Sequence, residues 1–140
     1  MDGKCLMLSH GFIKSVTMKI IKAIDAKEQK SPHGVDVKKL LDNANVVVSQ
    51  ITLRPGEALK KHVTPVDVFF FVLQGRGIVE IGDEEAEVGP DTLIDSPARI
   101  MHGWRNNGTD DLRFLVVKAP RPTEPTTMAC TGCAAKDQCQ

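Results

Sequence analysis

The sequence predicts a small all-β domain, a sandwich or barrel built from short strands. Proline and glycine recur at short intervals from Pro32 to Gly108, and the runs between them are brief and rich in Val, Ile, Leu and Phe. No stretch has the length and period of a convincing helix, because the best candidate, Asp25–Lys30, is short and polar. At 140 residues the chain is of a size that folds as one domain.

The apolar runs between the turn signals define the predicted strands in chain order. They are Lys19–Ala23, Val35–Leu41, Val46–Leu53, Leu59–His62, Val68–Gln74, Gly77–Ile81, Ala86–Val88, Thr92–Ile94, Arg99–His102 and Leu112–Lys118. Polar and apolar residues alternate in part along Val46–Leu53, so one face of that strand can be wetter than the other.

Charge and hydropathy exclude two classes of partner. Lys and Arg together number 18, as do Asp and Glu, and this balance argues against nucleic acid because phosphate binding needs a basic surplus. The longest apolar runs, such as Val68–Leu73, are far shorter than the about 20 residues of a membrane span. We therefore expect a cytoplasmic protein with neither nucleic acid nor membrane as its partner.

Composition divides the chain into three parts. Residues 1–17 make a poor signal peptide and precede a second possible start at Met18, so a dispensable leader, a mis-assigned start or an N-terminal arm all stay open. Residues 18–120 hold the predicted strands. Residues 121–140 begin as a Pro/Thr-rich linker or strap and end in a cysteine-rich tail.

Two motifs in the middle of the chain carry a family resemblance. Residues 55–77 read PGEALKKHVTPVDVFFFVLQGRG, in which Gly56, His62 and Gly75 are spaced as in the first motif of the cupin superfamily. Residues 89–106 read GPDTLIDSPARIMHGWRN, in which Pro97, His102 and Asn106 are spaced as in the second. Over about residues 34–118 the chain thus resembles a cupin. The resemblance implies a jelly-roll β-barrel, in keeping with the short-strand pattern.

The departures from the family pattern concern the metal ligands. Complete cupins hold a metal with three His and one Glu, but here the second His position is Thr64 and the Glu position is Val68. The pattern also departs at Gly89, which lies two places early, and at Arg99, which replaces a glycine. The resemblance thus leaves His62 and His102 as barrel ligands for Zn, Fe, Mn or Ni. A metal-free pocket, with the two histidines hydrogen-bonded, stays open.

Strand alternation predicts which side chains surround these histidines. Residues two apart point to the same side, so we expect a pocket lined by Thr64, Val68, Phe70, Val72 and Trp104. Such a pocket suits a small-molecule ligand, and a histidine pair can bind a carboxylate or transfer protons.

Four charged residues are further candidates near the pocket. Asp67 and Asp95 could supply a third, carboxylate ligand, although acids at strand ends are usually solvated. Arg99 and Arg105 either line the mouth and favour an anionic ligand or are surface residues. Asn106 is expected to order the loop after His102.

Three consecutive aromatic residues predict a homodimer. Phe69, Phe70 and Phe71 cannot all face one way, so Phe69 and Phe71 need a cover outside the pocket. A second subunit is the cover we expect.

The tail holds the other chemical signal. Cys130, Cys133 and Cys139 lie within eleven residues, and a C-x-x-C loop binds zinc or iron–sulfur clusters or forms a redox pair. Cys5 could be a fourth ligand, and a tail with incidental cysteines stays open.

The sequence therefore indicates a small-molecule-binding cupin with a pocket around His62 and His102, metal-dependent or metal-free. A cupin enzyme, such as an oxygenase or isomerase with an incomplete ligand set, is one alternative. A redox- or metal-sensing module that acts through the cysteine tail is the other.

Overall fold

The computed structural model describes residues 16–29, 31 and 33–129. Within them, one 3-10 helix, η1 (Ala23–Asp25), precedes a series of antiparallel strands. The strands are β1 (Glu28–Gln29), β2 (Asp36–Asp42), β3 (Val47–Leu53), β4 (Ala58–Val63), β5 (Asp67–Gln74), β6 (Gly77–Ile81), β7 (Glu84–Val88), β8 (Leu93–Ser96), β9 (Met101–Arg105), β10 (Leu112–Ala119) and β11 (Thr127–Met128).

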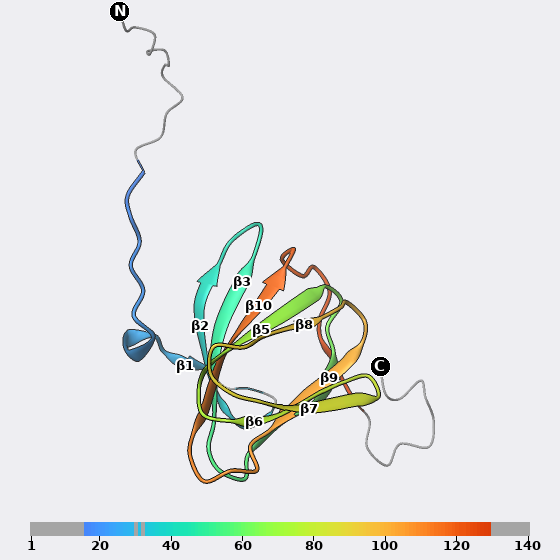
Figure 1. Cartoon of the computed structure of the whole chain (residues 1–140). Coiled ribbons are helices and arrows are strands. Elements are labelled where there is room, and N and C mark those ends of the chain that lie inside the picture. The colour runs from blue at the N-terminus through green and yellow to red at the C-terminus, as the bar shows by residue number, and fades with distance from the viewer. Residues whose placement is uncertain (1–15, 30, 32, 130–140) are drawn as a thin grey trace, which may run out of the picture.

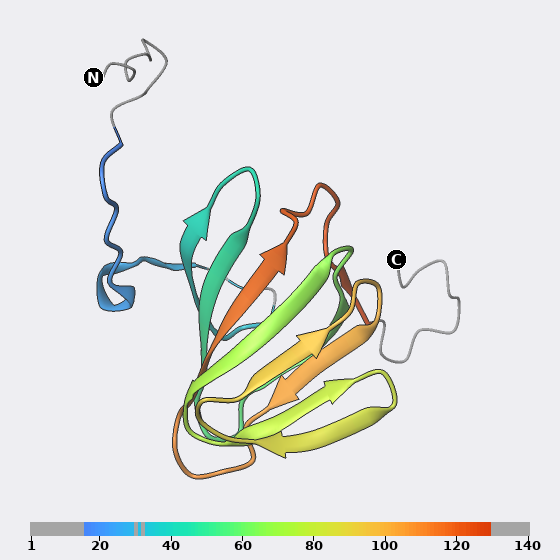
Figure 2. The same ribbon diagram turned by 45° about the horizontal axis from the view of Figure 1, so that its top comes forward.

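The strands form two sheets that face each other. One has the order β1-β2-β3-β10-β5-β8 and the other β11-β4-β9-β6-β7 (Figure 1). Turning the molecule shows β10 between β3 and β5, with the β6–β7 hairpin in the opposite layer (Figure 2). This is the jelly-roll arrangement predicted from the sequence. The sheets are not hydrogen-bonded into a closed barrel, so that part of the prediction is wrong: one end between the layers stays open.

The predicted strands from Val35–Leu41 onward each overlap one of β2 to β10. Lys19–Ala23 is not a strand, because no segment among the described residues pairs with its backbone, and residues 25–29 contain no α-helix. The sequence also missed β1 and β11, which have two residues each and too little apolar pattern to detect.

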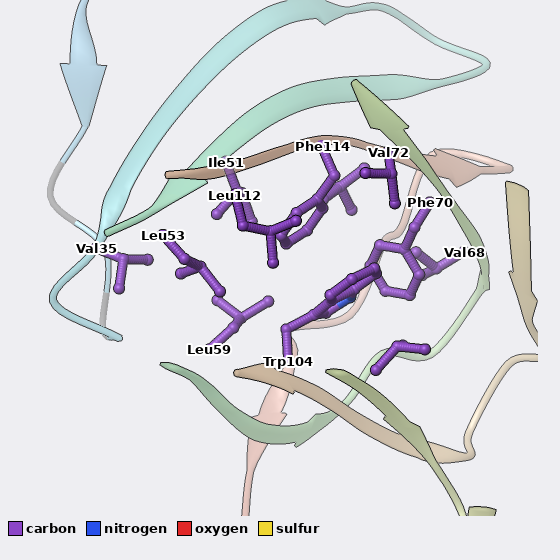
Figure 3. Packing of buried hydrophobic residues seen from close by; sticks show 12 residues of the cluster. Val35, Ile51, Leu53, Leu59, Val68, Phe70, Val72, Trp104, Leu112 and Phe114 are labelled. Carbon is purple, nitrogen blue, oxygen red and sulfur yellow. The ribbon is translucent and has the colours of Figure 1, made fainter. Parts of the chain in front are cut away.

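Alternation along the central strands builds the core between the layers. Val68, Phe70 and Val72 of β5 are at most 1% exposed, whereas Phe69 on the outer face is 37% exposed. Trp104 of β9 reaches across from the opposite sheet into this cluster and stacks on Phe114, with ring centroids 4.2 Å apart (Figure 3). Aromatic packing therefore joins the two sheets near the closed end.

The Pro/Thr-rich segment after β10 returns to the sheets. Thr127 and Met128 pair with Val63 and His62, and the Ala129 amide donates to the Lys61 carbonyl. The predicted strap is therefore hydrogen-bonded along the free edge of β4. Cys130, Cys133, Cys139 and Cys5 lie outside the described residues. No helix in the described ranges is long and apolar enough to cross a membrane.

Candidate functional site

A cavity of about 540 Å³ opens between the two sheets. Its polar lining includes His33, His62, His102 and Lys118, which come from the segment before β2 and from β4, β9 and β10. Its apolar lining comes mostly from the inner faces of β2, β3, β5 and β10, namely Val37, Val47, Ile51, Leu59, Val68, Phe70 and Val116. The volume is within the range of small-molecule sites.

Two buried histidines lie at the base of the cavity in one chain of hydrogen bonds. His62 and His102 face each other across β4 and β9, with their Nε2 atoms 3.0 Å apart. His62 Nδ1 lies 2.7 Å from the Lys60 carbonyl, which can only accept, so this nitrogen carries a proton. In the neutral pair, His102 Nε2 then donates to His62 Nε2, and the Ser96 hydroxyl donates to His102 Nδ1 at 2.7 Å.

A third histidine approaches the pair from a distant part of the chain. The His33 ring lies 4.8 Å from the His62 ring, centroid to centroid. Its Nδ1 accepts the Lys60 backbone N–H at 3.1 Å, so its proton is on Nε2. Lys60 thus fixes two imidazoles, one through its N–H and one through its carbonyl.

Burial keeps these imidazoles neutral. Desolvation, followed by repulsion from His62, lowers the pKa of His33 to about 4 and that of His102 to about 3. Desolvation also lowers the pKa of His62, against the opposing effect of its hydrogen bond to the Lys60 carbonyl. At neutral pH the three rings can accept or donate hydrogen bonds without bringing charge into the cavity.

Comparison with known proteins places this architecture in a family. The family model of the cupin domain matches residues 49–118, which include both histidine motifs. The chain belongs to the cupin family. A curated relative from Streptomyces cyaneus, named polyketide synthase CurC, is 26% identical over 113 residues, which cover 75% of this chain and 73% of CurC.

Solved structures share the cupin fold. The polyketide cyclase RemF from Streptomyces resistomycificus superposes with a TM-score of 0.73 at 24% identity, covering 83% of this chain and 88% of RemF. KdgF from a Halomonas species gives a TM-score of 0.65 at 20% identity, covering 75% of this chain and 96% of KdgF. At these identities the likeness extends to the fold alone.

Of the residues predicted to line the cupin pocket, some line the cavity and others lie elsewhere in the interior. Val68 and Phe70 line the cavity with His62 and His102. Thr64, Val72 and Trp104 do not line it. Val72 and Trp104 are buried in the packed interior, where the opposing aromatic rings fill the space between the sheets. Thr64 is buried with its hydroxyl oxygen 3.5 Å from His102 Nε2.

The charged candidates near the cupin motifs lie outside the cavity. An Asp67 carboxylate oxygen accepts the Ala98 amide, and Asp95 is exposed on β8. Arg99 pairs with Glu124, and Arg105 pairs with Glu80 and Glu85 on the opposite side of its sheet. Asn106 orders its loop as expected, with its amide donating to the Leu53 and Asp110 carbonyls.

The described residues do not fit a cupin metal site with three or more protein ligands. His62 and His102 offer two converging nitrogens, but Val68 has no donor atom, and His33 carries its proton on the nitrogen that remains free. No group of three or more His, Cys, Asp and Glu side chains in residues 16–29, 31 and 33–129 is arranged to hold a metal ion. Catalytic zinc sites usually have three such ligands.

His33 and Lys118 are among the cavity residues that sequence reasoning missed. His33 lies in a turn outside both cupin motifs, and only its contact with Lys60, 27 positions away, reveals it. Lys118 did carry a signal: it follows Leu112, Phe114 and Val116 at intervals of two, on the inward face of its strand.

The lowered histidine pKa values predict an acid-sensitive fold. Unfolded chains take up these protons near pH 6.5, whereas folded His33 and His102 resist protonation down to about pH 4 and about pH 3. Stability is therefore complete above pH 6.5 and falls as the pH drops, by up to about 1.4 kcal/mol per pH unit for each histidine. Urea unfolding of EDTA-treated protein between pH 7.5 and 5 measures this slope.

The variant His33→Gln provides the control, because glutamine keeps an acceptor for the Lys60 amide but does not titrate. Its stability should fall less steeply with pH than that of the wild type. A wild-type protein equally stable at pH 7.5 and pH 5 would contradict the neutral histidine cluster.

Proposed function

We propose that this cupin binds a small organic molecule in the cavity beside His62 and His102. The observation that carries the proposal is the lining itself, in which neutral imidazoles with a fixed hydrogen-bond direction lie next to an apolar wall. Apolar walls with a few fixed polar groups are the usual composition of ligand sites. The likeness to CurC supports a small-molecule role of this kind.

A fragment screen followed by NMR tests this function. Binding should shift the side-chain resonances of His62, His102 and Met128, which line the cavity, and leave those of distant residues such as Ile78 unchanged. The variant Ser49→Phe should abolish the shifts, because a larger side chain on the inner face of β3 fills the cavity. Fragments that bind Ser49→Phe as well as wild type would contradict the proposal.

An enzyme is the alternative within the same cavity. The polyketide cyclase RemF shares the fold, and the chain of hydrogen bonds from Ser96 through His102 to His62 supports proton transfer to or from a bound molecule. In the same screen, an enzyme would convert a bound fragment into a product, whose resonances would replace those of the fragment over time.

Metal binding at the same pair is a second candidate. Two ligands of one zinc ion lie roughly 3 Å apart, and the Nε2 atoms of His62 and His102 have that separation. The proposal needs solvent or the bound molecule to supply the remaining ligands. It also needs the His102 proton on Nδ1, donated to the Ser96 hydroxyl oxygen, so that Nε2 is free to bind the metal. The cysteine tail is the competing location, and which of Zn or an iron–sulfur cluster it would hold stays open.

Elemental analysis of Zn, Fe, Mn and Ni in three proteins separates these locations. A barrel site predicts about one equivalent in the wild type and in a Cys130, Cys133 and Cys139 to serine variant, and none in a His62→Ala, His102→Ala variant. If the cysteine-to-serine variant contains no metal while the His62→Ala, His102→Ala variant keeps it, the metal site lies in the tail.

We also propose that the chain forms a homodimer through the outer face of the six-stranded sheet. Phe69 of β5 and Leu93 of β8 are 37% and 57% exposed on this face. Leu115 and Val117 of β10 lie beside Phe71 and Phe69 of β5 on the same face. A second apolar surface supports a partner: Val16, Met18 and Ile20 are at least 75% exposed on a segment that extends away from the sheets (Figure 1). Exposed apolar patches of this kind mark interfaces.

Sedimentation velocity tests the dimer. The wild type should sediment with twice the mass of the chain, and a Phe69→Glu, Leu93→Glu variant should sediment as a monomer because it places charges in the interface. Ile100→Glu is the matched control, since Ile100 is 40% exposed outside this face. A wild type that stays monomeric at high concentration would contradict the proposed dimer. An Ile100→Glu variant that is as fully monomeric as the Phe69→Glu, Leu93→Glu variant would contradict the assignment of the interface to this face.

A further inference from the structure

Lys118 occupies a position in which a lysine is costly. It is half-buried near the open end of β10, on the face that holds Leu112, Phe114 and Val116. Its neighbours on the two adjacent strands are Val47 of β3 and Val68 of β5, which also line the cavity. Burial, followed by repulsion from Lys39, lowers the pKa of Lys118. A cation surrounded by apolar neighbours needs a compensating partner.

The described residues do not supply that partner. The carboxylate in the cavity lining is that of Asp42, and it already pairs with Lys39 at 3.0 Å and with Arg121 at 2.8 Å. Lys118 forms no hydrogen bond or ion pair with any residue in the described ranges. Three cationic side chains and one carboxylate line the cavity, while its histidines are neutral at pH 7. The cavity therefore has a surplus of positive charge.

His33 adds a directed donor to the same cavity. Because the Lys60 amide occupies its Nδ1, the proton on Nε2 is available to a ligand. His33 and Lys118 both line this cavity. The cavity therefore offers a ligand a cation and a neutral N–H donor beside the apolar side chains of Val47, Val68 and Phe70.

We propose that the ligand is an organic carboxylate with an apolar body, its carboxylate held by Lys118 Nζ and His33 Nε2–H. The apolar body lies against Val47, Val68 and Phe70. This inference rests on the proposed small-molecule function and adds the chemical class of the ligand. Neither Lys118 nor His33 belongs to the two histidine motifs, so the proposed selectivity comes from residues outside those motifs.

Calorimetry with a charged and a neutral probe of the same shape tests the inference. The probes are 4-phenylbutanoate and 4-phenylbutanamide, titrated into the full chain at low ionic strength, where attraction to the ammonium is least screened. The wild type should bind the carboxylate at least about ten-fold more tightly than the amide, because hydrogen bonds to charged groups are the stronger ones. Lys118→Met keeps the length of the side chain without its charge and should remove this preference.

Lys61→Met is the matched control, because Lys61 is exposed on β4 and does not line the cavity. It should bind both probes as the wild type does. His33→Phe removes the second donor without touching Lys118, and should weaken carboxylate binding more than amide binding, because the hydrogen bond to the charged acceptor is the stronger one. Because this variant does not alter β10, it also tests the site if Lys118→Met fails to fold.

The outcomes separate this inference from the proposed function. If wild type binds both probes equally, or if Lys118→Met keeps the preference for the carboxylate, the carboxylate assignment is wrong and the cavity still binds small molecules. If the carboxylate fails to bind while other fragments shift the cavity resonances, the assignment is equally wrong. If no fragment of any class shifts those resonances, the proposed function itself fails.

Discussion

The arrangement of the cavity depends on the backbone of one residue, Lys60. The pairing of β4 with β9 shifts register between Leu59 and His62, and β11 pairs with β4 only at His62 and Val63. The Lys60 peptide groups are thereby free of the sheet ladder. Its N–H holds His33 and its carbonyl holds His62, so a local irregularity in one strand sets the tautomers of two imidazoles.

The tautomers in turn decide what the cavity can do. With His62 protonated on Nδ1, its Nε2 faces His102, and the pair is held between a serine hydroxyl and a backbone carbonyl. Val68, in place of the family glutamate, extends the apolar wall up to this pair. In the proposed complex, the body of the organic ligand lies against this apolar wall and its polar end lies at Lys118 and His33.

The fold was predictable from short-range information, and the site only in part. Turn residues and apolar alternation located β2 to β10, and the spacing of His62 and His102 located the base of the cavity. The inward position of Lys118 could have been predicted from the same alternation. His33 could not, because a histidine in an exposed-looking turn gains its role only through a contact 27 residues away. Trp104 faced inward as expected, but the sequence does not show how far the aromatic cluster fills the space between the sheets.

A direct measurement of the imidazole tautomers tests the central role of Lys60. Long-range proton–nitrogen NMR correlations distinguish protonated from bare ring nitrogens for each histidine. At pH 7.5 we expect His62 to be protonated on Nδ1 and His33 on Nε2, each as a single neutral tautomer. A His33 that is protonated on Nδ1, or that exchanges between both tautomers as a solvent-exposed histidine does, would show that Lys60 does not hold it and that the cavity is not organised as described.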